Sequence, residues 1–132
     1  MSENPLIAVV DDDASMRGAL QRLLRSVGLR AAVFASAEEF LQAGQLQGTA
    51  CVILDVRMPR MSGLELQRHL ATTHCPIPLI FITAHGDEEA RERALRAGAV
   101  DFLYKPFREE LLLRAIQSAL QASREGGGGA QC

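Results

Sequence analysis

Carboxylates in this sequence occur where apolar runs end. Asp55 directly follows the run 51–54, and Asp11–Asp13 directly follow the run 6–10. Such runs are typical of strands buried on both faces, and ligands of parallel α/β sheets collect at the carboxyl ends of the strands. Clustered carboxylates need a counter-charge, and oxygen ligands suit a hard cation such as Mg²⁺. These acids therefore predict a divalent metal site.

Two other apolar runs end in a hydroxyl and in an ammonium group. Thr83 follows the run 79–82, and Lys105 follows the run 100–104. Lys105 is the only lysine among the 14 basic residues, and lysine supplies a compact charge where the broad guanidinium of arginine would not fit. Beside the carboxylates these groups suit phosphoryl chemistry, in which an aspartate can accept the phosphoryl group. Asp55, at the end of the central run, is the predicted acceptor.

The apolar runs alternate with helical patterns along the whole chain. Strands are expected near 6–10, 29–34, 51–55, 79–83 and 100–104, and helices near 16–27, 36–41, 63–71, 88–97 and 111–120. Regular alternation predicts a parallel sheet covered by helices on both faces. Because parallel strands all point the same way, the side chains that follow them should meet at one edge.

Length and composition indicate one soluble domain. The chain has 132 residues, of which 48% are hydrophobic and 23% charged, and its net charge of -2 gives it no basic surface for nucleic acid. The three cysteines are odd in number and lack C-x-x-C spacing, which favours the reducing cytoplasm. No segment has the roughly 20 apolar residues of a membrane span. We expect a domain over 1–124 and a glycine-rich linker or tail over 125–132.

Taken together, these motifs resemble the receiver domains of two-component response regulators, from Leu6 to about Ser123. The resemblance implies a flavodoxin-like, doubly wound α/β fold: a five-stranded parallel sheet in the order 2-1-3-4-5 with five helices. The motifs that carry it are Asp11–Asp13 after Val9-Val10, Asp55-x-x-Met58-Pro59 with Ser62-Gly63, Thr83-Ala84, and Gly98-Ala99-x-Asp101-Phe102 ahead of Lys105-Pro106.

The resemblance also implies how the site works. Asp55 would accept a phosphoryl group from a sensor histidine kinase, with Mg²⁺ or Mn²⁺ as cofactor. The metal ligands would be Asp12, Asp55 and the backbone carbonyl of Arg57, with Asp11 acting through water, and the phosphoryl oxygens would be bound by Thr83, the backbone of Ala84, and Lys105. Such a domain is a signalling module, not a turnover enzyme, although it assists its own phosphorylation and dephosphorylation.

A switch is implied as well. Thr83 would shift toward the phosphoryl group, and Phe102 would turn inward. The Lys105–Pro106 bond would be cis, an isomer that about 5–6% of X-Pro bonds adopt in folded proteins. These changes would alter the surface of the fourth helix, fifth strand and last helix, through which a homodimer could form. Arg57 and His85, two residues beyond Asp55 and Thr83, occupy positions that tune phosphate lifetime in similar receivers; solvated side chains are the alternative.

The output is expected to be transcription. Residues 81–87, 98–102 and 105–107 resemble receivers that are joined to LuxR-type helix-turn-helix domains. A DNA-binding domain would then follow the linker at 125–132, and this chain would reach DNA only through that domain. The alternative is a stand-alone receiver that acts through protein-protein contacts.

Two other classes of protein share parts of this pattern. Haloacid-dehalogenase-type phosphohydrolases form an aspartyl-phosphate but carry a second aspartate two residues after the nucleophile. Arg57 stands there, which disfavours a phosphohydrolase; sustained phosphate release from small phosphoesters would revive that reading. A flavin carrier of the same fold is disfavoured because Asp11–Asp13 would repel the FMN phosphate, and a yellow chromophore would reveal it.

Overall fold

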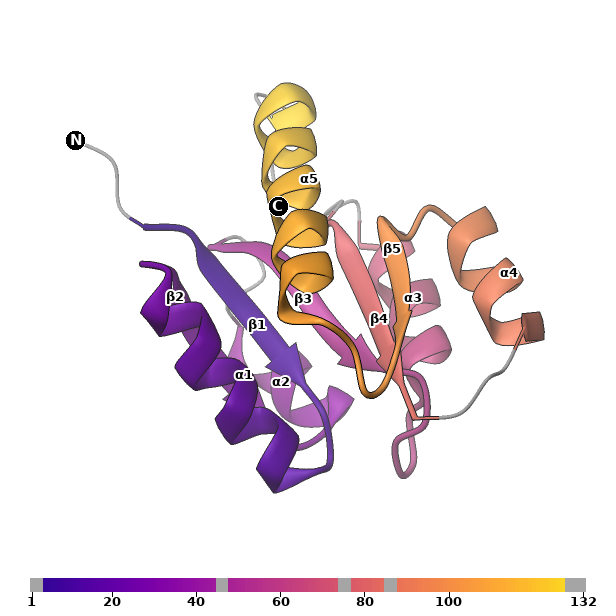
Figure 1. Cartoon of the computed structure of the whole chain (residues 1–132). Helices are drawn as coiled ribbons and strands as arrows, with labels where there is room; N and C mark the ends of the chain where they lie inside the picture. Colours follow the sequence, from indigo (N-terminus) through magenta and orange to yellow (C-terminus); the bar gives the residue numbers. More distant parts are fainter. Residues whose placement is uncertain (1–3, 45–47, 74–76, 85–87, 128–132) are drawn as a thin grey trace.

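The computed structural model describes residues 4–44, 48–73, 77–84 and 88–127, with side chains as far as residue 122. Strands and helices alternate throughout this part of the chain (Figure 1). They are β1 (Leu6–Val10), α1 (Ala14–Ser26), β2 (Arg30–Phe34), α2 (Ala37–Ala43), β3 (Thr49–Asp55), α3 (Gly63–Ala71), β4 (Leu79–Thr83), α4 (Glu88–Arg96), β5 (Asp101–Tyr104) and α5 (Glu109–Gly127). The predicted alternation is confirmed, with boundaries shifted by a few residues.

The five strands form one parallel sheet in the order β2-β1-β3-β4-β5, as the resemblance implied. Val10 is level with Leu54, Asp55 with Ile82, and Thr83 with Tyr104. The register therefore brings the last residues of β1, β3, β4 and β5 to one side of the sheet, which we call the carboxyl edge.

Two apolar layers cover the two faces of the sheet. Successive strand residues point to opposite faces, so Val52 and Leu54 pack under α2, α3 and α4, whereas Cys51 and Ile53 pack under α1 and α5. Figure 1 shows α1 and α5 on the near side of the sheet, with α2 and α3 behind it. Burial on both faces explains why the runs are apolar throughout instead of alternating. It also raises the pKa of the Cys51 thiol to about 12, so this cysteine is inert core.

Short polar side chains begin the helices that leave the carboxyl edge. Asp13 is the N-cap of α1 and accepts hydrogen bonds from the backbone of Ser15 and Met16. Ser62 caps α3 and forms a complete capping box with Glu65. Ser36 and Glu39 have the sequence spacing of a second capping box, at α2. It is only half formed, because the Glu39 carboxylate accepts from Ala35 N instead of the N-cap nitrogen.

The last helix is longer than the sequence predicts. α5 continues to Gly127, so residues 125–127 of the predicted linker are helical, and residues 128–132 lie outside the described part. Extending an existing helix by a few residues is cheap compared with nucleating one, even though each glycine costs about 1 kcal/mol relative to alanine. No helix in the described part of the chain could cross a bilayer, because none combines the necessary length with sufficient hydropathy.

Candidate functional site

Lys105 joins two carboxylates from different strands at the carboxyl edge. Its Nζ donates to Asp11 Oδ2 at 3.0 Å and to Asp55 Oδ2 at 3.1 Å. Asp11 is fully buried, Asp55 is 7% exposed, and the side chain of Lys105 is 14% exposed. Partly desolvated ion pairs of this kind are held much more firmly than surface pairs. The residues meet because β1 and β3 are adjacent parallel strands, and the chain returns from β5 beside them.

Asp12 completes an acidic cluster with Asp11 and Asp55. One carboxylate oxygen from each of these residues lies within 4.8 Å of the others. Asp12 is exposed, whereas the other two are buried, so the cluster opens to solvent on one side. A single ammonium group cannot neutralise three carboxylates, and a set of hard oxygen donors fits a divalent cation. The residues present therefore suit a metal site.

For both Asp11 and Lys105, burial shifts the pKa in one direction and hydrogen bonds shift it in the other. Burial raises the pKa of Asp11, although hydrogen bonds from Asp13 N and Lys105 partly offset the effect. For Lys105, burial alone would lower the pKa, but the hydrogen bonds to Asp11 and Asp55 together with the attraction of their charges outweigh it, so the pKa of Lys105 is raised. Lys105 consequently stays an ammonium at neutral pH.

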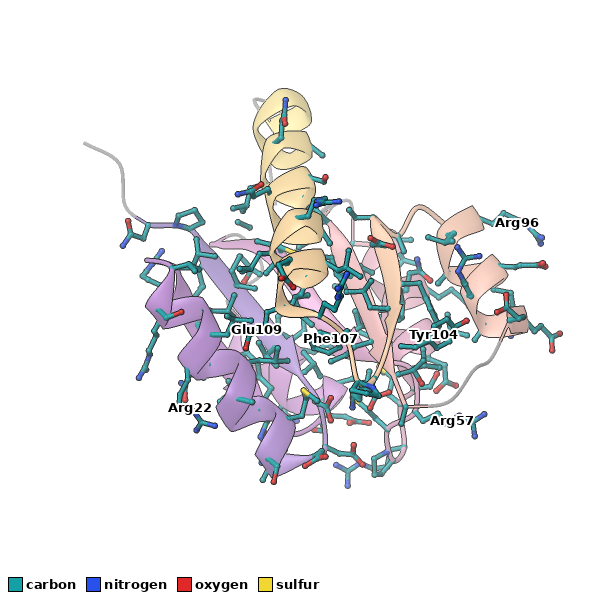
Figure 2. All side chains as sticks on the ribbon, viewed as in Figure 1. Arg22, Arg57, Arg96, Tyr104, Phe107 and Glu109 are labelled. Carbon is teal, nitrogen blue, oxygen red and sulfur yellow. The ribbon has the colours of Figure 1, made fainter. Side chains whose placement is uncertain are left out.

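The loop after β3 fixes the Asp55 carboxylate. Arg57 N donates to Asp55 Oδ1 at 3.1 Å, and Gly63 N donates to Val56 O at 2.8 Å, which closes the loop against the end of the strand. The Arg57 side chain is exposed and points away from the sheet in Figure 2. It borders an open groove of about 650 Å³ whose lining also includes Asp12, Met58, Ser62, Glu89 and Arg93. The groove thus extends from Asp12 and the loop after β3 to α4.

Thr83 and Ala84 lie at the same edge but differ in exposure. Thr83 is buried at the end of β4, and its carbonyl accepts a 2.7 Å hydrogen bond from Lys105 N. Ala84 follows it and is exposed. The Lys105–Pro106 peptide is cis, the isomer that the resemblance implies. His85 lies outside the described residues.

Phe102 lies in the apolar layer and does not touch the acidic cluster. It is 4% exposed and stacks on Phe81 with ring centroids 5.8 Å apart. Tyr104 contacts the edge of the same ring, and its hydroxyl donates to Glu88 Oε2 at the start of α4, 3.2 Å away. Figure 2 places Tyr104 between β5 and α4. This aromatic row connects β4 and β5 to the first turn of α4.

One residue at the site was missed by sequence reasoning. Arg17 falls outside the apolar stripe of α1, which suggests only a solvated side chain. In the structure its Nη1 donates to the carbonyl oxygen of Asp11 at 2.7 Å. Helical spacing gives the direction in which a residue leaves its helix, but not where the end of a long side chain finds a partner. No sequence signal could have revealed this contact.

Comparison with known proteins decides the family. The family model for the response regulator receiver domain matches residues 7–117, a range that contains the acidic cluster, Thr83 and Lys105. The chain belongs to the response regulator receiver family. This receiver is similar to nodulation protein W of Bradyrhizobium diazoefficiens, with 48% identity over 94% of the chain and 55% of that protein.

Two further relatives are a transcriptional regulatory protein and a response regulator of known structure. The transcriptional regulatory protein FixJ of Bradyrhizobium diazoefficiens is 42% identical over 87% of this chain and 56% of its own length. The solved structure of the response regulator StyR superposes with a TM-score of 0.89 at 46% identity, covering 95% of this chain and 63% of that one. The receiver spans about half the length of the curated relatives it matches.

Adding Mg²⁺ or Mn²⁺ is expected to stabilise the receiver. A ligand that binds only the folded state raises the free energy of unfolding by about 2.7 kcal/mol at 100 times its Kd. The Asp12→Asn variant should lose most of this gain, whereas Glu110→Gln, an exposed change at the start of α5, should keep it. Thermal unfolding at several metal concentrations measures the effect. An Asp12→Asn variant that gains as much stability as wild type would remove Asp12 from the metal site.

Proposed function

We propose that the receiver accepts a phosphoryl group on Asp55 from a phosphohistidine of a sensor histidine kinase. The observation that carries the proposal is the position of this carboxylate. It lies at the end of the central strand, 3.1 Å from an ammonium group and beside two further carboxylates. In the transfer, a bond forms between an Asp55 oxygen and phosphorus while the phosphorus–nitrogen bond breaks. The electron pair returns to the imidazole nitrogen, which takes up a proton from solvent.

The groups around Asp55 have separate roles in this proposal. Lys105, the Thr83 hydroxyl and the Ala84 backbone N–H bind phosphoryl oxygens, and the Arg57 N–H keeps the carboxylate oriented. Mg²⁺ or Mn²⁺, when bound, offsets negative charge on those oxygens. Its ligands are Asp12, Asp55 and the Arg57 carbonyl. Asp11 would contact the metal through water.

The direct test is incubation with Mg²⁺ and acetyl phosphate. We expect intact-mass analysis to show one phosphoryl group per chain, in a bond that is stable to acid and labile to base. Borohydride reduction converts an aspartyl-phosphate into homoserine, so peptide mass spectrometry can locate the modified residue. Absence of the adduct, or reduction at a residue other than Asp55, would contradict the proposal.

Phosphorylation would act on output through the aromatic row and α4. We propose that Thr83 and Phe102 adjust to the phosphoryl group and shift the α4–β5–α5 surface between two existing states, so that a homodimer forms. The support is the stack of Phe102 on Phe81 and the Tyr104 bond to Glu88. Sedimentation velocity before and after acetyl phosphate should show a larger species only in the phosphorylated sample. An unchanged sedimentation coefficient would count against the dimer.

The output itself would be transcription. We propose that a helix-turn-helix domain joined through the segment after α5 contacts DNA. The support is that two relatives, TdiR and FixJ, are named transcriptional regulatory proteins. A location in the cytoplasm stays a prediction of the sequence. Sequencing the gene beyond the codon for Cys132 tests the proposal, because a reading frame that stops there would leave a stand-alone receiver acting through protein contacts.

Phosphate lifetime should depend on Arg57. The Arg57 side chain points away from the sheet, but its guanidinium can turn toward a phosphoryl group on Asp55, where it would donate to a phosphoryl oxygen or block water. Arg57→Ala is therefore expected to shorten the half-life of the phosphorylated receiver roughly two- to fivefold, equivalent to about 0.5–1 kcal/mol. We expect the same direction for His85→Ala. The decay of the adduct after removal of acetyl phosphate gives the half-life. Arg96→Ala, an exposed change on α4, is the control, and half-lives equal to wild type would leave both residues as solvated side chains.

A further inference from the structure

The Asp12 carboxylate belongs to the acidic cluster but is exposed. Within the described part of the chain it accepts no hydrogen bond. Its oxygen nevertheless lies within 4.8 Å of oxygens of Asp11 and Asp55. An exposed carboxylate without a partner samples several rotamers, so its mean position depends on how firmly its main chain is held. How firmly the peptide between Asp11 and Asp12 is held therefore affects where the Asp12 carboxylate lies in the acidic cluster.

Asp11 anchors one side of that peptide with every polar group it has. Its N–H donates to Phe34 O at 3.1 Å. Its Oδ1 accepts from Asp13 N at 2.9 Å, and its Oδ2 accepts from Lys105 Nζ at 3.0 Å. The remaining group is the carbonyl oxygen, which belongs to the Asp11–Asp12 peptide itself. Arg17 Nη1 donates to this oxygen at 2.7 Å, the shortest of the four bonds.

Arg17 is itself held at both ends. Its backbone N–H donates to Asp13 O at 3.0 Å as α1 begins, and Asp13 is the N-cap of the same helix. The side chain is half-buried and reaches back past the cap to the strand end. A charged donor to a carbonyl oxygen forms a strong hydrogen bond, worth about 1.5–3 kcal/mol. Arg17 thus ties the first turn of α1 to the peptide that precedes Asp12.

We propose that Arg17 is a positioning residue of the metal site. It fixes the Asp11–Asp12 peptide, so that the Asp12 carboxylate faces Asp55. The inference rests on the proposed binding of a divalent cation by Asp12 and Asp55, and adds to it a residue that touches neither the cation nor the phosphoryl group. Replacing residues that hold metal ligands in place through hydrogen bonds commonly changes metal affinity by roughly 10–100-fold.

Positioning and simple electrostatics predict opposite outcomes. The guanidinium is a positive charge near three carboxylates, and a positive charge disfavours a nearby cation. If Arg17 acted only through its charge, removing it would tighten divalent-metal binding. If it positions Asp12, removing it frees the peptide and weakens binding. The direction of the change in Kd therefore separates the two roles.

The experiment is a Mn²⁺ titration of the intact chain, with unbound Mn²⁺ measured by electron paramagnetic resonance. We expect the Arg17→Ala variant to bind Mn²⁺ about tenfold more weakly than wild type, at the lower end of the roughly 10–100-fold range. Arg17→Lys, which keeps the charge and a shorter donor, should lose less. Arg22→Ala removes the same charge from an exposed position on α1 that points away from the sheet in Figure 2, and should bind as wild type does.

Each result decides between the two roles. Thermal unfolding of the metal-free variants checks that they are folded, and if Arg17→Ala is not, Arg17→Gln takes its place, because it removes the charge and keeps a short N–H donor. Binding as tight as wild type, or tighter, in the charge-removing variant overturns the inference while leaving the proposed function intact. A wild-type chain that binds no Mn²⁺ overturns the metal site and the role of Arg17 together.

Discussion

Replacing Asp55 with asparagine is expected to abolish phosphorylation of the receiver without unfolding it. The amide nitrogen is no nucleophile for phosphorus at neutral pH, and the amide oxygen forms no stable adduct. Asparagine has the same shape, so its Oδ1 can still accept from Arg57 N. Lys105 keeps its bond to Asp11. Because one charge also leaves a crowded acidic cluster, the free energy of unfolding should fall by no more than about 1 kcal/mol.

Two measurements on Asp55→Asn are needed together. Intact-mass analysis after acetyl phosphate gives the labelled fraction, and urea unfolding gives the stability. Glu92→Gln, an exposed change of a carboxylate to an amide on α4, is the matched control and should label fully. Strong labelling of a folded Asp55→Asn variant would move the acceptor to another carboxylate. An unfolded variant would instead show that the Asp55 charge is needed to hold Lys105.

The convergence of the site could be predicted from sequence because it depends on strand direction alone. Once Asp11, Asp55 and Lys105 were recognised as residues that follow buried parallel strands, their meeting at one edge required no side-chain detail. The two lysine bonds at 3.0 and 3.1 Å agree with that expectation. The order of the strands in the sheet could not be predicted in the same way. Alternation alone leaves several orders open, and the observed one was anticipated only through the resemblance.

What the sequence could not supply is the placement of atoms at the ends of long or flexible groups. Two examples are the hydrogen bond from Arg17 to Asp11 O and the one from Ala35 N to the Glu39 carboxylate. Both depend on side-chain rotamers, which are decided by packing in the folded protein. The last helix extends further than expected, to Gly127, for another reason: composition predicts where a helix is weak, not where it stops. The burial of Phe102 follows from its strand pattern.

Gly63 is the backbone position on which the geometry around Asp55 most depends. It is the first residue of α3, and its N–H closes the loop on Val56 O at 2.8 Å. A Cβ atom here would overlap the Asp55 carbonyl oxygen and would lie 3.1 Å from both Asp55 C and Val56 Cα. All three are backbone atoms of the buried central strand and its exit, so none of them can rotate away.

The Gly63→Ala variant is therefore expected to lose about 3 kcal/mol of stability, the upper range for overpacking, because the start of α3 must move off the strand. That movement would also displace the loop that orients Asp55, so labelling by acetyl phosphate should slow markedly in the fraction that folds. Urea unfolding and the rate of labelling measure the two effects. Gly48→Ala, where an added Cβ meets nothing within 4 Å, should change stability by less than about 1 kcal/mol. Equal stabilities for the two variants would mean that α3 can shift at little cost, and that the close contact at Gly63 does not hold the acceptor in place.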